Sequence, residues 1–504
     1  MDFSKSLISF SDHLNDQWSV DDAMKGVSIM GGTGSGKTTS SGKNLAMTYL
    51  KQGWGGLVLC AKSDEADLWR DYCRKVGREQ DLIVFGKDAV HDMESPFPGE
   101  EIVFNPIDYE AKRKGIGGAE VLNITNIFMN IYRMGNRIAS EGDTKEERYW
   151  DTALKRCLNR VIELLKLADE DISYSNMVKV INSSNEVEKD KLTDTIVLLE
   201  RGEENLEDLE KTNFCLKCLV KSYTIHFAES ENASKEVQNA YNLVVEYFTN
   251  AMPAMGSRTK SVVTESFMGL AEPFLSGVLH KHFAGSTNIF PELTFTDQMI
   301  IVLDFPIKEF LDAGIIAQCV FKLMFQQAVE RRDVSKYPTP VFLWCDEAQY
   351  FVNPYDQIFL TTARSSRTAT VFLSQNISNY FAVMGSGADA KARVDSLMGN
   401  LSTKIFHSNS DAETNLYASK IIGDDIFEFE GRSTSASFTN FSFSDSSSVS
   451  QSYSPQVQPR KFTMLKSGGE KNNFQVESIV FVTGKKWSND TNYIETTFTQ
   501  NFNS

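Results

Sequence analysis

The chain has 504 residues, of which 41% are hydrophobic, and a formal net charge of −16. It is long enough for two or three packed units of a soluble globular protein, and it has neither a run of ~18 apolar residues nor the layout of a signal peptide. The acidic charge argues against a surface that binds nucleic acid everywhere, but it is compatible with basic loops confined to a pore. Seven scattered cysteines, an odd number, indicate a reducing cytosol, so we expect a cytoplasmic protein.

The first residues place apolar side chains at helical spacing: Phe3, Leu7, Phe10 and Leu14. This spacing predicts an N-terminal helix with one apolar face. Such a face either covers its own domain or docks on a partner or a membrane surface.

A phosphate-binding loop follows at residues 31–38, where GGTGSGKT fits the pattern G-x-x-x-x-G-K-[ST]. The apolar run 27–30 precedes it, and a helical pattern leads from it to Leu50. This context predicts a strand, a loop whose N–H groups surround the phosphates of ATP, and a helix. Lys37 is expected to bridge the β- and γ-phosphates and Thr38 to hold Mg²⁺. The other residues expected to bind the nucleotide are Gly31, Gly34, Ser35, Gly36 and Thr39.

Short apolar runs alternate with helical patterns in this part of the chain. Strands are predicted over residues 55–60 and 81–85, with a helix through Leu68 and Tyr72 between them. The alternation predicts an α/β fold with a mostly parallel sheet and helices on both faces. Nucleotide then binds at the carboxyl ends of the strands, where Lys62 is also expected to lie.

From about residue 111 to residue 290 strand signals become rare and helical periods appear, as in residues 149–167. The acidic stretch 186–210 is predicted to be a solvated helix or connection. We expect residues 111–290 to form an all-α domain inserted into the nucleotide-binding domain. The latter would comprise residues 1–110 and 291–430, and a Ser-rich segment with C-terminal strands would occupy residues 431–504.

Beyond the insertion, the sheet is predicted to resume at residues 299–304, followed by a long helix over residues 313–331. The next apolar strand, 340–345, ends in Asp346 and Glu347. Asp346 would hold Mg²⁺ through water, and Glu347 would orient and deprotonate the attacking water. Acids at a strand end are a weak signal by themselves, but together with the phosphate loop they predict hydrolysis.

Three polar residues around the next predicted strand, 370–374, are candidates for the same site. Gln375 ends the strand and can reach the γ-phosphate or the attacking water, the alternative being a loop hydrogen bond. Arg364 and Arg367 precede the strand on an edge that we expect to face another subunit. Either could supply an arginine finger, and the alternative for each is a surface salt bridge.

The last part of the chain is predicted to be strand-rich. Strands are expected over residues 401–406, 474–482 and 493–502. The Ser-rich segment 433–454 carries Phe438, Phe441 and Phe443 among polar residues. It is either a low-complexity tail or a β-ribbon.

Taken in order, these motifs resemble those of the TraG/TraD-like type IV coupling proteins, ring ATPases of bacterial conjugation in the HerA–FtsK class. The resemblance spans residues 25–425. It is carried by GGTGSGKT at Gly31, LVLCAKSDE at Leu57, FNPI at Phe104, the helix of Trp150, LWCDEA at Leu343, ARSSRTATVFLSQ at Ala363, and GNLSTKIF with DAETNLYASKIIG between Gly399 and Gly423.

The resemblance implies a RecA-like P-loop motor interrupted by an all-α domain and assembled as a homo-hexamer. Such a ring uses ATP and Mg²⁺ to move DNA, or to hand a relaxase–DNA substrate and secreted protein cargo to type IV secretion channel subunits. Arg364 would match the arginine that reaches a neighbour's nucleotide, and Gln375 would match the sensor. The all-α domain would face the cytoplasm and help to select cargo.

One departure concerns the membrane. Family members usually begin with a transmembrane pair, whereas the phosphate loop here starts near residue 31, so no transmembrane segment is expected. The protein would then be a coupling protein recruited to the inner face of the bacterial membrane by another subunit, or a soluble HerA/FtsK-like DNA translocase. A nucleotide-gated protein adaptor is a third hypothesis, which the acidic charge favours, whereas Glu347, Gln375 and Arg364 favour a motor. DNA contacts are expected to be sequence-independent contacts to the backbone.

Overall fold

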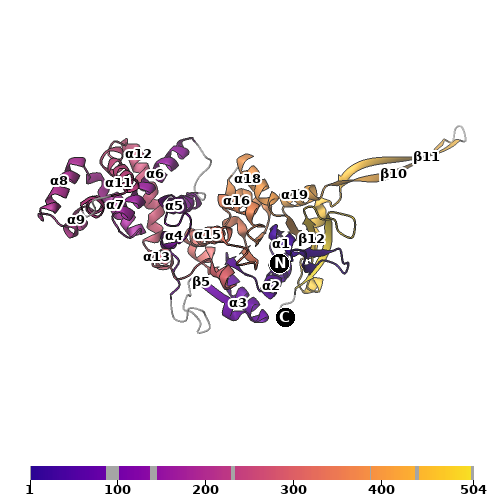
Figure 1. Cartoon of the computed structure of the whole chain (residues 1–504). Helices are drawn as coiled ribbons and strands as arrows, with labels where there is room; N and C mark the ends of the chain where they lie inside the picture. Colours follow the sequence, from indigo (N-terminus) through magenta and orange to yellow (C-terminus); the bar gives the residue numbers. More distant parts are fainter. Residues whose placement is uncertain are drawn as a thin grey trace. The chain divides into compact units, whose positions relative to one another are not determined.

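The computed structural model describes residues 2–86, 101–136, 145–228, 233–385, 388–437 and 442–500. Phe438, Phe441 and the end of the strand predicted over residues 493–502 therefore lie outside the described residues. The chain divides into two compact units (Figure 1). The first contains residues 1–58, 70–78 and 332–504, and the second contains residues 59–69 and 79–331.

A mostly parallel sheet forms the centre of the first unit. β3 is parallel to both β8 and β9, and β7 is parallel to β8, whereas β12 is antiparallel to β9 and β13. The parallel strands are buried throughout, as expected for strands whose two faces are both covered. The strand order is β13 (Tyr493–Thr499), β12 (Gln475–Val482), β9 (Thr403–Phe406), β3 (Val27–Met30), β8 (Thr368–Ser374), β7 (Val341–Cys345) and β4 (Gly55–Leu59).

Helices connect these strands. The helix after the phosphate loop begins with a π-helical turn, η1 (Thr38–Gly42), and continues as α2 (Lys43–Lys51). Helix α3 (Glu65–Val76) contributes its residues 70–76 to this unit. The other helices are α1 (Val20–Met24), η7 (Ala348–Tyr350), α16 (Pro354–Thr362), α17 (Ile377–Met384), α18 (Ala388–Gly399), α19 (Ala412–Ile422), α20 (Pro459–Thr463) and η8 (Glu470–Asn472).

The prediction of a helix at the N-terminus is wrong. Residues 6–9 form β1 (Ser6–Ser9), which pairs with β2 (Gln17–Ser19) in an antiparallel hairpin. Ile8 and Phe10 are buried at the two-residue spacing of a strand, whereas Leu14 is 85% exposed. The apolar face inferred at helical spacing therefore does not exist, because Phe10 and Leu14 do not share an environment.

The second unit contains a parallel strand pair and a large aromatic core. β5 (Leu82–Gly86) pairs with β6 (Ile300–Asp304) in the register Leu82 to Ile300. The long helix α15 (Ile307–Arg331) follows β6 and is kinked at Leu311. The η2 turn (Glu79–Asp81) leads into β5. Buried rings that contact one another are those of Phe85, Phe104, Phe283, Phe305 and Phe321.

The described residues between β5 and β6 form helices and no strand, in agreement with the helical texture of that part of the sequence. The expectation that residues 111–290 are a separable domain stays a prediction. The helices are α4 (Pro106–Lys112), α5 (Val121–Asn136), α6 (Lys145–Leu167), α7 (Tyr174–Ser183), η3 (Ser184–Glu186), α8 (Lys189–Glu200), α9 (Leu206–Thr212), α10 (Phe214–Tyr223), η4 (Thr224–Ala228), α11 (Lys235–Glu246), η5 (Tyr247–Ala251), α12 (Ser257–Ala271), η6 (Glu272–Phe274), α13 (Gly277–Phe283) and α14 (Leu293–Thr296).

The Ser-rich segment is a β-ribbon. β10 (Asp424–Ser437) and β11 (Ser442–Pro455) pair antiparallel over their whole length, from Asp424 opposite Pro455 to Ser437 opposite Ser442 (Figure 1). Of the two alternatives left by the sequence, the ribbon is therefore the one observed. At its base the side chains of Ile426, Phe429 and Tyr453 are exposed.

Within the described part of the chain, no single helix has the length and apolar composition needed to cross a membrane. One pair of helical segments passes that test jointly, residues 257–274 with residues 277–283, but the pair is bent by 74°.

Candidate functional site

The phosphate loop, residues 31–38, connects β3 to η1 at the carboxyl end of a central strand. Gly34 and Gly36 have φ values of 72° and 84°, which L side chains rarely adopt. A Cβ atom at Gly31 would lie 2.4 Å from Ser35 Oγ, so the turn also requires a glycine there. These glycines give the loop the curvature that aims backbone N–H groups at an anion.

The acids after β7 lie against this loop. The Thr38 hydroxyl donates a hydrogen bond to Asp346 Oδ2 at 3.3 Å. The Lys37 ammonium is 3.9 Å from Glu347 Oε1, and both side chains are buried. Two sequence segments 308 residues apart thus place a lysine, a threonine and two carboxylates in one group.

Gln375, at the end of β8, joins the same group. Its amide nitrogen donates to Glu347 Oε1 at 3.3 Å, and its amide oxygen accepts a hydrogen bond from Thr33 Oγ1 at 3.2 Å. The side chain therefore connects the phosphate loop to the carboxylate that is the candidate base. Asn409 Nδ2 holds the Gln375 backbone by donating to its carbonyl at 2.8 Å.

Glu347 is held in place by a residue that the sequence interpretation did not include. Gln349 Nε2 donates to Glu347 Oε2 at 3.1 Å, and Gln349 Oε1 accepts from the Ser374 hydroxyl at 2.9 Å. The Glu347 backbone is left-handed, with φ 46°. Such a conformation in a non-glycine residue costs of order 1–3 kcal/mol. A glutamine two residues after the acid, in a buried turn, was the available sequence signal.

His407 forms a hydrogen bond with the helical turn that follows the phosphate loop. It follows β9, is buried, and lies with Nε2 2.7 Å from the Ser41 hydroxyl and Nδ1 3.2 Å from the Glu477 carbonyl. Because a carbonyl only accepts, Nδ1 carries the proton and Nε2 accepts from Ser41. The pKa of His407 is lowered to about 4, against 6.5 for an exposed histidine, mainly by burial and to a smaller extent by the charge of Lys37. His407 could have been found as a polar residue at the end of the strand that neighbours β3.

The end of β13 reaches the same loop. Gln500 Nε2 donates to Thr39 Oγ1 at 2.6 Å, and Gln500 Oε1 accepts from the Gly469 backbone N–H at 2.8 Å. A Cβ atom at Gly36 would lie 2.7 Å from the Val476 side chain, so β12 also packs closely on the loop. Nothing in the sequence indicated this contact, since Gln500 is 461 residues from Thr39.

The two candidate arginine fingers lie elsewhere in the first unit and are engaged within the chain. Arg364 pairs with Asp21, with both Nε and Nη2 at 2.8 Å from Oδ1, and it is 64% exposed. Arg367 donates to the Pro338 carbonyl at 2.7 Å and lies over the Phe3 ring. The structure does not bring either arginine into the group formed by Lys37, Glu347 and Gln375.

Lys62 belongs to the second unit. Its ammonium lies 3.5 Å from Glu65 Oε1 at the start of α3. Its expected role in binding nucleotide stays a prediction.

The loop has the features that a bound nucleoside triphosphate requires. Within the described part of the chain, the buried Ser35 hydroxyl has no hydrogen-bond partner. A Cβ atom at Gly34 would contact nothing within 4 Å, so the mouth of the loop is open. Thr38 and Asp346 supply the hydroxyl and carboxylate oxygens that Mg²⁺ prefers. These residues fit both a triphosphate and its magnesium ion.

Comparison with protein families finds a match. A family described as "TraM recognition site of TraD and TraG" matches residues 340–466. This stretch includes the two acids, both arginines, Gln375 and the ribbon. Comparison with curated protein sequences finds no match.

The fold is similar to that of solved bacterial conjugative coupling proteins. Unbound TrwBdeltaN70 superposes with a TM-score of 0.54 at 12% identity, covering 99% of this chain and 91% of that one. TrwBdeltaN70 in complex with sulphate superposes with a TM-score of 0.54 at 13% identity, covering 99% of this chain and 94% of that one. TrwB in complex with ADP and Mg²⁺ gives 0.51 at 13% identity, covering 99% and 90%. This chain therefore shares the fold of these coupling proteins, an α/β fold with a mostly parallel sheet, as the sequence predicted.

Proposed function

We propose that this chain, which is similar to the TraG/TraD-like type IV coupling proteins, is an ATP-hydrolysing ring motor that moves DNA or a relaxase–DNA substrate to a secretion channel. The observation that carries the proposal is the group around Glu347. One of its carboxylate oxygens lies 3.9 Å from the Lys37 ammonium and 3.3 Å from the Gln375 amide. A carboxylate held between the lysine of the phosphate loop and a polar side chain can orient and deprotonate an attacking water, whereas a nucleotide-gated adaptor needs no such base.

The residues take the following roles in this proposal. Lys37 and the loop N–H groups bind the phosphates, together with Ser35 of the loop and Thr39 directly after it. Thr38 and Asp346 hold Mg²⁺, which when bound neutralises charge on the phosphate oxygens. Glu347 accepts a proton from the attacking water, and Gln375 orients that water. Arg364 of a neighbouring subunit supplies the positive charge for the developing phosphoryl oxygens.

The first test separates binding from hydrolysis. Lys37→Ala should lose affinity for ATP, because the charge on the phosphates is no longer matched. Glu347→Gln should bind ATP normally and fail to cleave it, because an amide cannot take the proton. Gln375→Ala should also bind ATP and cleave it more slowly. If Glu347→Gln hydrolyses ATP at the wild-type rate, the assignment of the base is wrong.

The second test concerns the partner. DNA that stimulates the ATPase activity would support a motor, and an ATPase indifferent to DNA would support the adaptor. Relaxase and channel subunits that co-purify with the chain would support coupling, and their absence from a DNA-stimulated ATPase would support a free translocase. A particle image with an ATP analogue and DNA tests the homo-hexameric ring directly.

The helical region, residues 111–290, is proposed to recognise cargo. Its deletion should leave an ATPase core that binds nucleotide and should abolish transfer of the natural substrate. Unchanged transfer by a deletion variant that still folds would contradict this assignment.

A further inference from the structure

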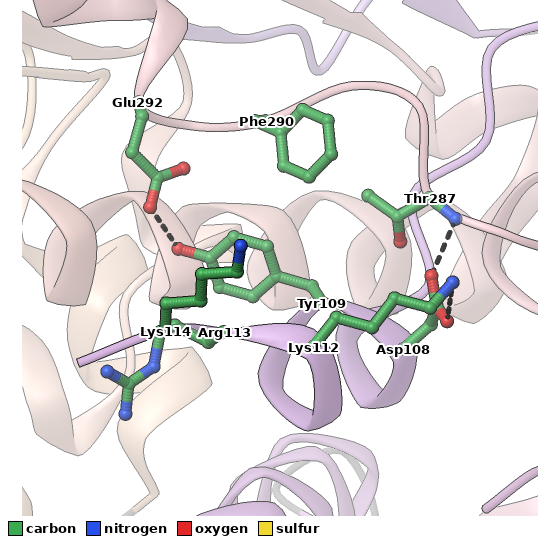
Figure 2. Close-up of a pocket in the computed structure, with 8 residues that line it drawn as sticks. All are labelled: Asp108, Tyr109, Lys112, Arg113, Lys114, Thr287, Phe290 and Glu292. Atoms are coloured by element: carbon green, nitrogen blue, oxygen red, sulfur yellow. Dashed lines mark hydrogen bonds and ion pairs between the residues drawn. The ribbon is translucent and has the colours of Figure 1, made fainter. Parts of the chain in front are cut away.

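A pocket in the second unit is lined by basic and aromatic side chains that have no part in the candidate ATPase site (Figure 2). Its volume is about 450 Å³, which is in the range of small-ligand sites. One side is formed by α4 and the two residues after it, and the other by the segment 287–292.

Local capping interactions fix the two sides relative to each other. Asn105 caps α4 by accepting hydrogen bonds from the backbone of Ile107 and Asp108, and Pro106 occupies the first helical position. Asp108 in turn accepts a hydrogen bond from the Thr287 backbone at 2.9 Å. Asn105 and Thr287 are joined by two further hydrogen bonds. The pocket is therefore a built feature of this unit.

The basic side chains of the pocket come from Lys112-Arg113-Lys114, the only run of three consecutive lysine or arginine residues in an acidic chain. Arg113 is engaged by both carboxylate oxygens of Glu110. Lys112 is 66% exposed and pairs with Asp108 at 2.6 Å. Exposed pairs of this kind are weak, so an anion can compete for the ammonium. Lys114 is exposed and has no carboxylate partner within the described ranges of the chain.

The aromatic and acidic side chains complement this charge. The Phe290 ring is 42% exposed and faces the pocket, with Tyr109 packed beneath it at a centroid distance of 6.4 Å (Figure 2). The Tyr109 hydroxyl donates to Glu292 Oε1 at 2.5 Å. Glu292 Oε2 is buried and has no hydrogen-bond partner among the residues that the structure describes, so it can accept a hydrogen bond from a ligand. Figure 2 shows Glu292 and the Lys112–Asp108 pair on opposite sides of Tyr109.

We propose that this pocket binds one nucleotide unit of single-stranded DNA, with the base on Phe290 and its phosphates at Lys112 and Lys114. A base edge supplies an N–H donor for Glu292 Oε2. Each of the four bases has such a donor, so the contact is sequence-tolerant, as is stacking on an aromatic ring. The identity of the polymer rests on the proposed function, because the same chemistry would also accept a free nucleoside phosphate.

The experiment measures binding of a fluorescein-labelled 20-nucleotide single strand to the full chain at several salt concentrations. Phe290→Leu keeps an apolar side chain and removes the ring, and it should weaken binding by about 5- to 150-fold with an unchanged salt slope. Lys112→Gln with Lys114→Gln should weaken binding and lower the slope of log K against log salt by about 1.4, because two phosphate contacts are lost. The difference in salt slope between the two variants separates stacking from charge. A general loss of folding would not produce that difference.

Lys211→Gln is the matched control, since Lys211 is an exposed lysine of the same unit that also pairs with an aspartate. It should leave both affinity and slope unchanged, and all variants should keep the basal ATPase activity. A wild-type chain that binds DNA, together with pocket variants that bind it equally well, would overturn this inference and leave the motor intact. A wild-type chain that does not bind DNA would overturn the proposed function as well. AMP that binds to the chain and is lost in Phe290→Leu, while DNA binding is kept, would overturn the assignment to DNA and identify a mononucleotide site.

Discussion

Arg364 and Asp21 form an ion pair in which two guanidinium nitrogens share one carboxylate oxygen, each at 2.8 Å. Asp21 lies in the first turn of α1 and also pairs with Lys25 at 2.6 Å. Although burial alone would raise it, the pKa of Asp21 is lowered by the hydrogen bonds and charges of Lys25 and Arg364. The arginine proposed to act on a neighbour's nucleotide is therefore held within its own chain by a partner that stays ionised at neutral pH.

The proposed role of Arg364 predicts complementation between subunits. Arg364→Ala should bind nucleotide normally and hydrolyse it poorly, because a finger arginine is worth roughly 10³–10⁵ in rate. Mixing it with Lys37→Ala should restore part of the ATPase activity, since some sites then have an intact loop and a neighbour's arginine. The measurement is ATPase activity of the mixture against each variant alone. No recovery in mixtures shown to form joint rings would move the assignment to Arg367.

The Asp21 pair predicts that the finger is partly restrained in the isolated subunit. Asp21→Asn should lower the protein concentration at which ATPase per subunit is half-maximal, by up to about 5-fold, because an exposed pair is worth at most ~1 kcal/mol. A titration of ATPase activity against protein concentration measures this shift. Lys75→Gln, which breaks the exposed pair with Asp71, is the control. An unchanged or higher half-maximal concentration in Asp21→Asn would show that the pair does not restrain the finger.

His407 predicts a specific loss of stability in acid. Its folded-state pKa of about 4 is below the unfolded value of 6.5, so the unfolded state binds the proton first as the pH falls. The stability that neutral His407 provides is complete above pH 6.5 and falls by about 2 kcal/mol between pH 7 and pH 5. The destabilisation caused by His407→Gln should therefore shrink by about that amount at pH 5. Urea unfolding of both proteins at the two pH values measures the difference, and a difference independent of pH would contradict the assignment.

Gln500 predicts an effect of the C-terminal strand on nucleotide binding. Gln500→Ala removes the hydrogen bond to Thr39, worth about 0.5–1.5 kcal/mol, and should weaken ATP binding by up to about tenfold. Gln500→Glu should weaken it more, because a carboxylate cannot donate to Thr39 and adds a negative charge beside the phosphates. Titration with a fluorescent ATP analogue gives the order. Tighter binding by Gln500→Glu than by Gln500→Ala would contradict this account.

The parts of the fold that the sequence predicted are those with a local signal. The strands β3, β4, β5, β7 and β8 were visible as short apolar runs, and the phosphate loop was visible as a fixed spacing of glycines. The convergence of Lys37, Glu347 and Gln375 followed from placing polar residues at the carboxyl ends of parallel strands. That rule needs only strand positions, which the sequence contains.

The features that the sequence did not predict depend on tertiary contacts. The N-terminal hairpin was mistaken for a helix, because Phe3, Leu7 and Phe10 match a helical period. The two-residue spacing of the buried Ile8 and Phe10 is a signal that only packing distinguishes from chance. The Gln500–Thr39 and Arg364–Asp21 contacts join residues hundreds of positions apart with no motif at either end. The pocket around Phe290 required the pairing of α4 with a segment about 180 residues later.

The ribbon formed by β10 and β11 leaves and re-enters the first unit at adjacent points. Gln456 donates its backbone N–H to the Gly423 carbonyl at 3.0 Å, directly below the Asp424–Pro455 pair. The chain thus returns after 32 residues to the point at which it left the unit, and the described residues of this segment contribute no strand to the central sheet. A tight turn could replace the whole ribbon without a break in the register of its neighbours. We therefore expect that the ribbon can lengthen, shorten or change its sequence without altering the central sheet, and that it tolerates the insertion of a fluorescent or affinity tag.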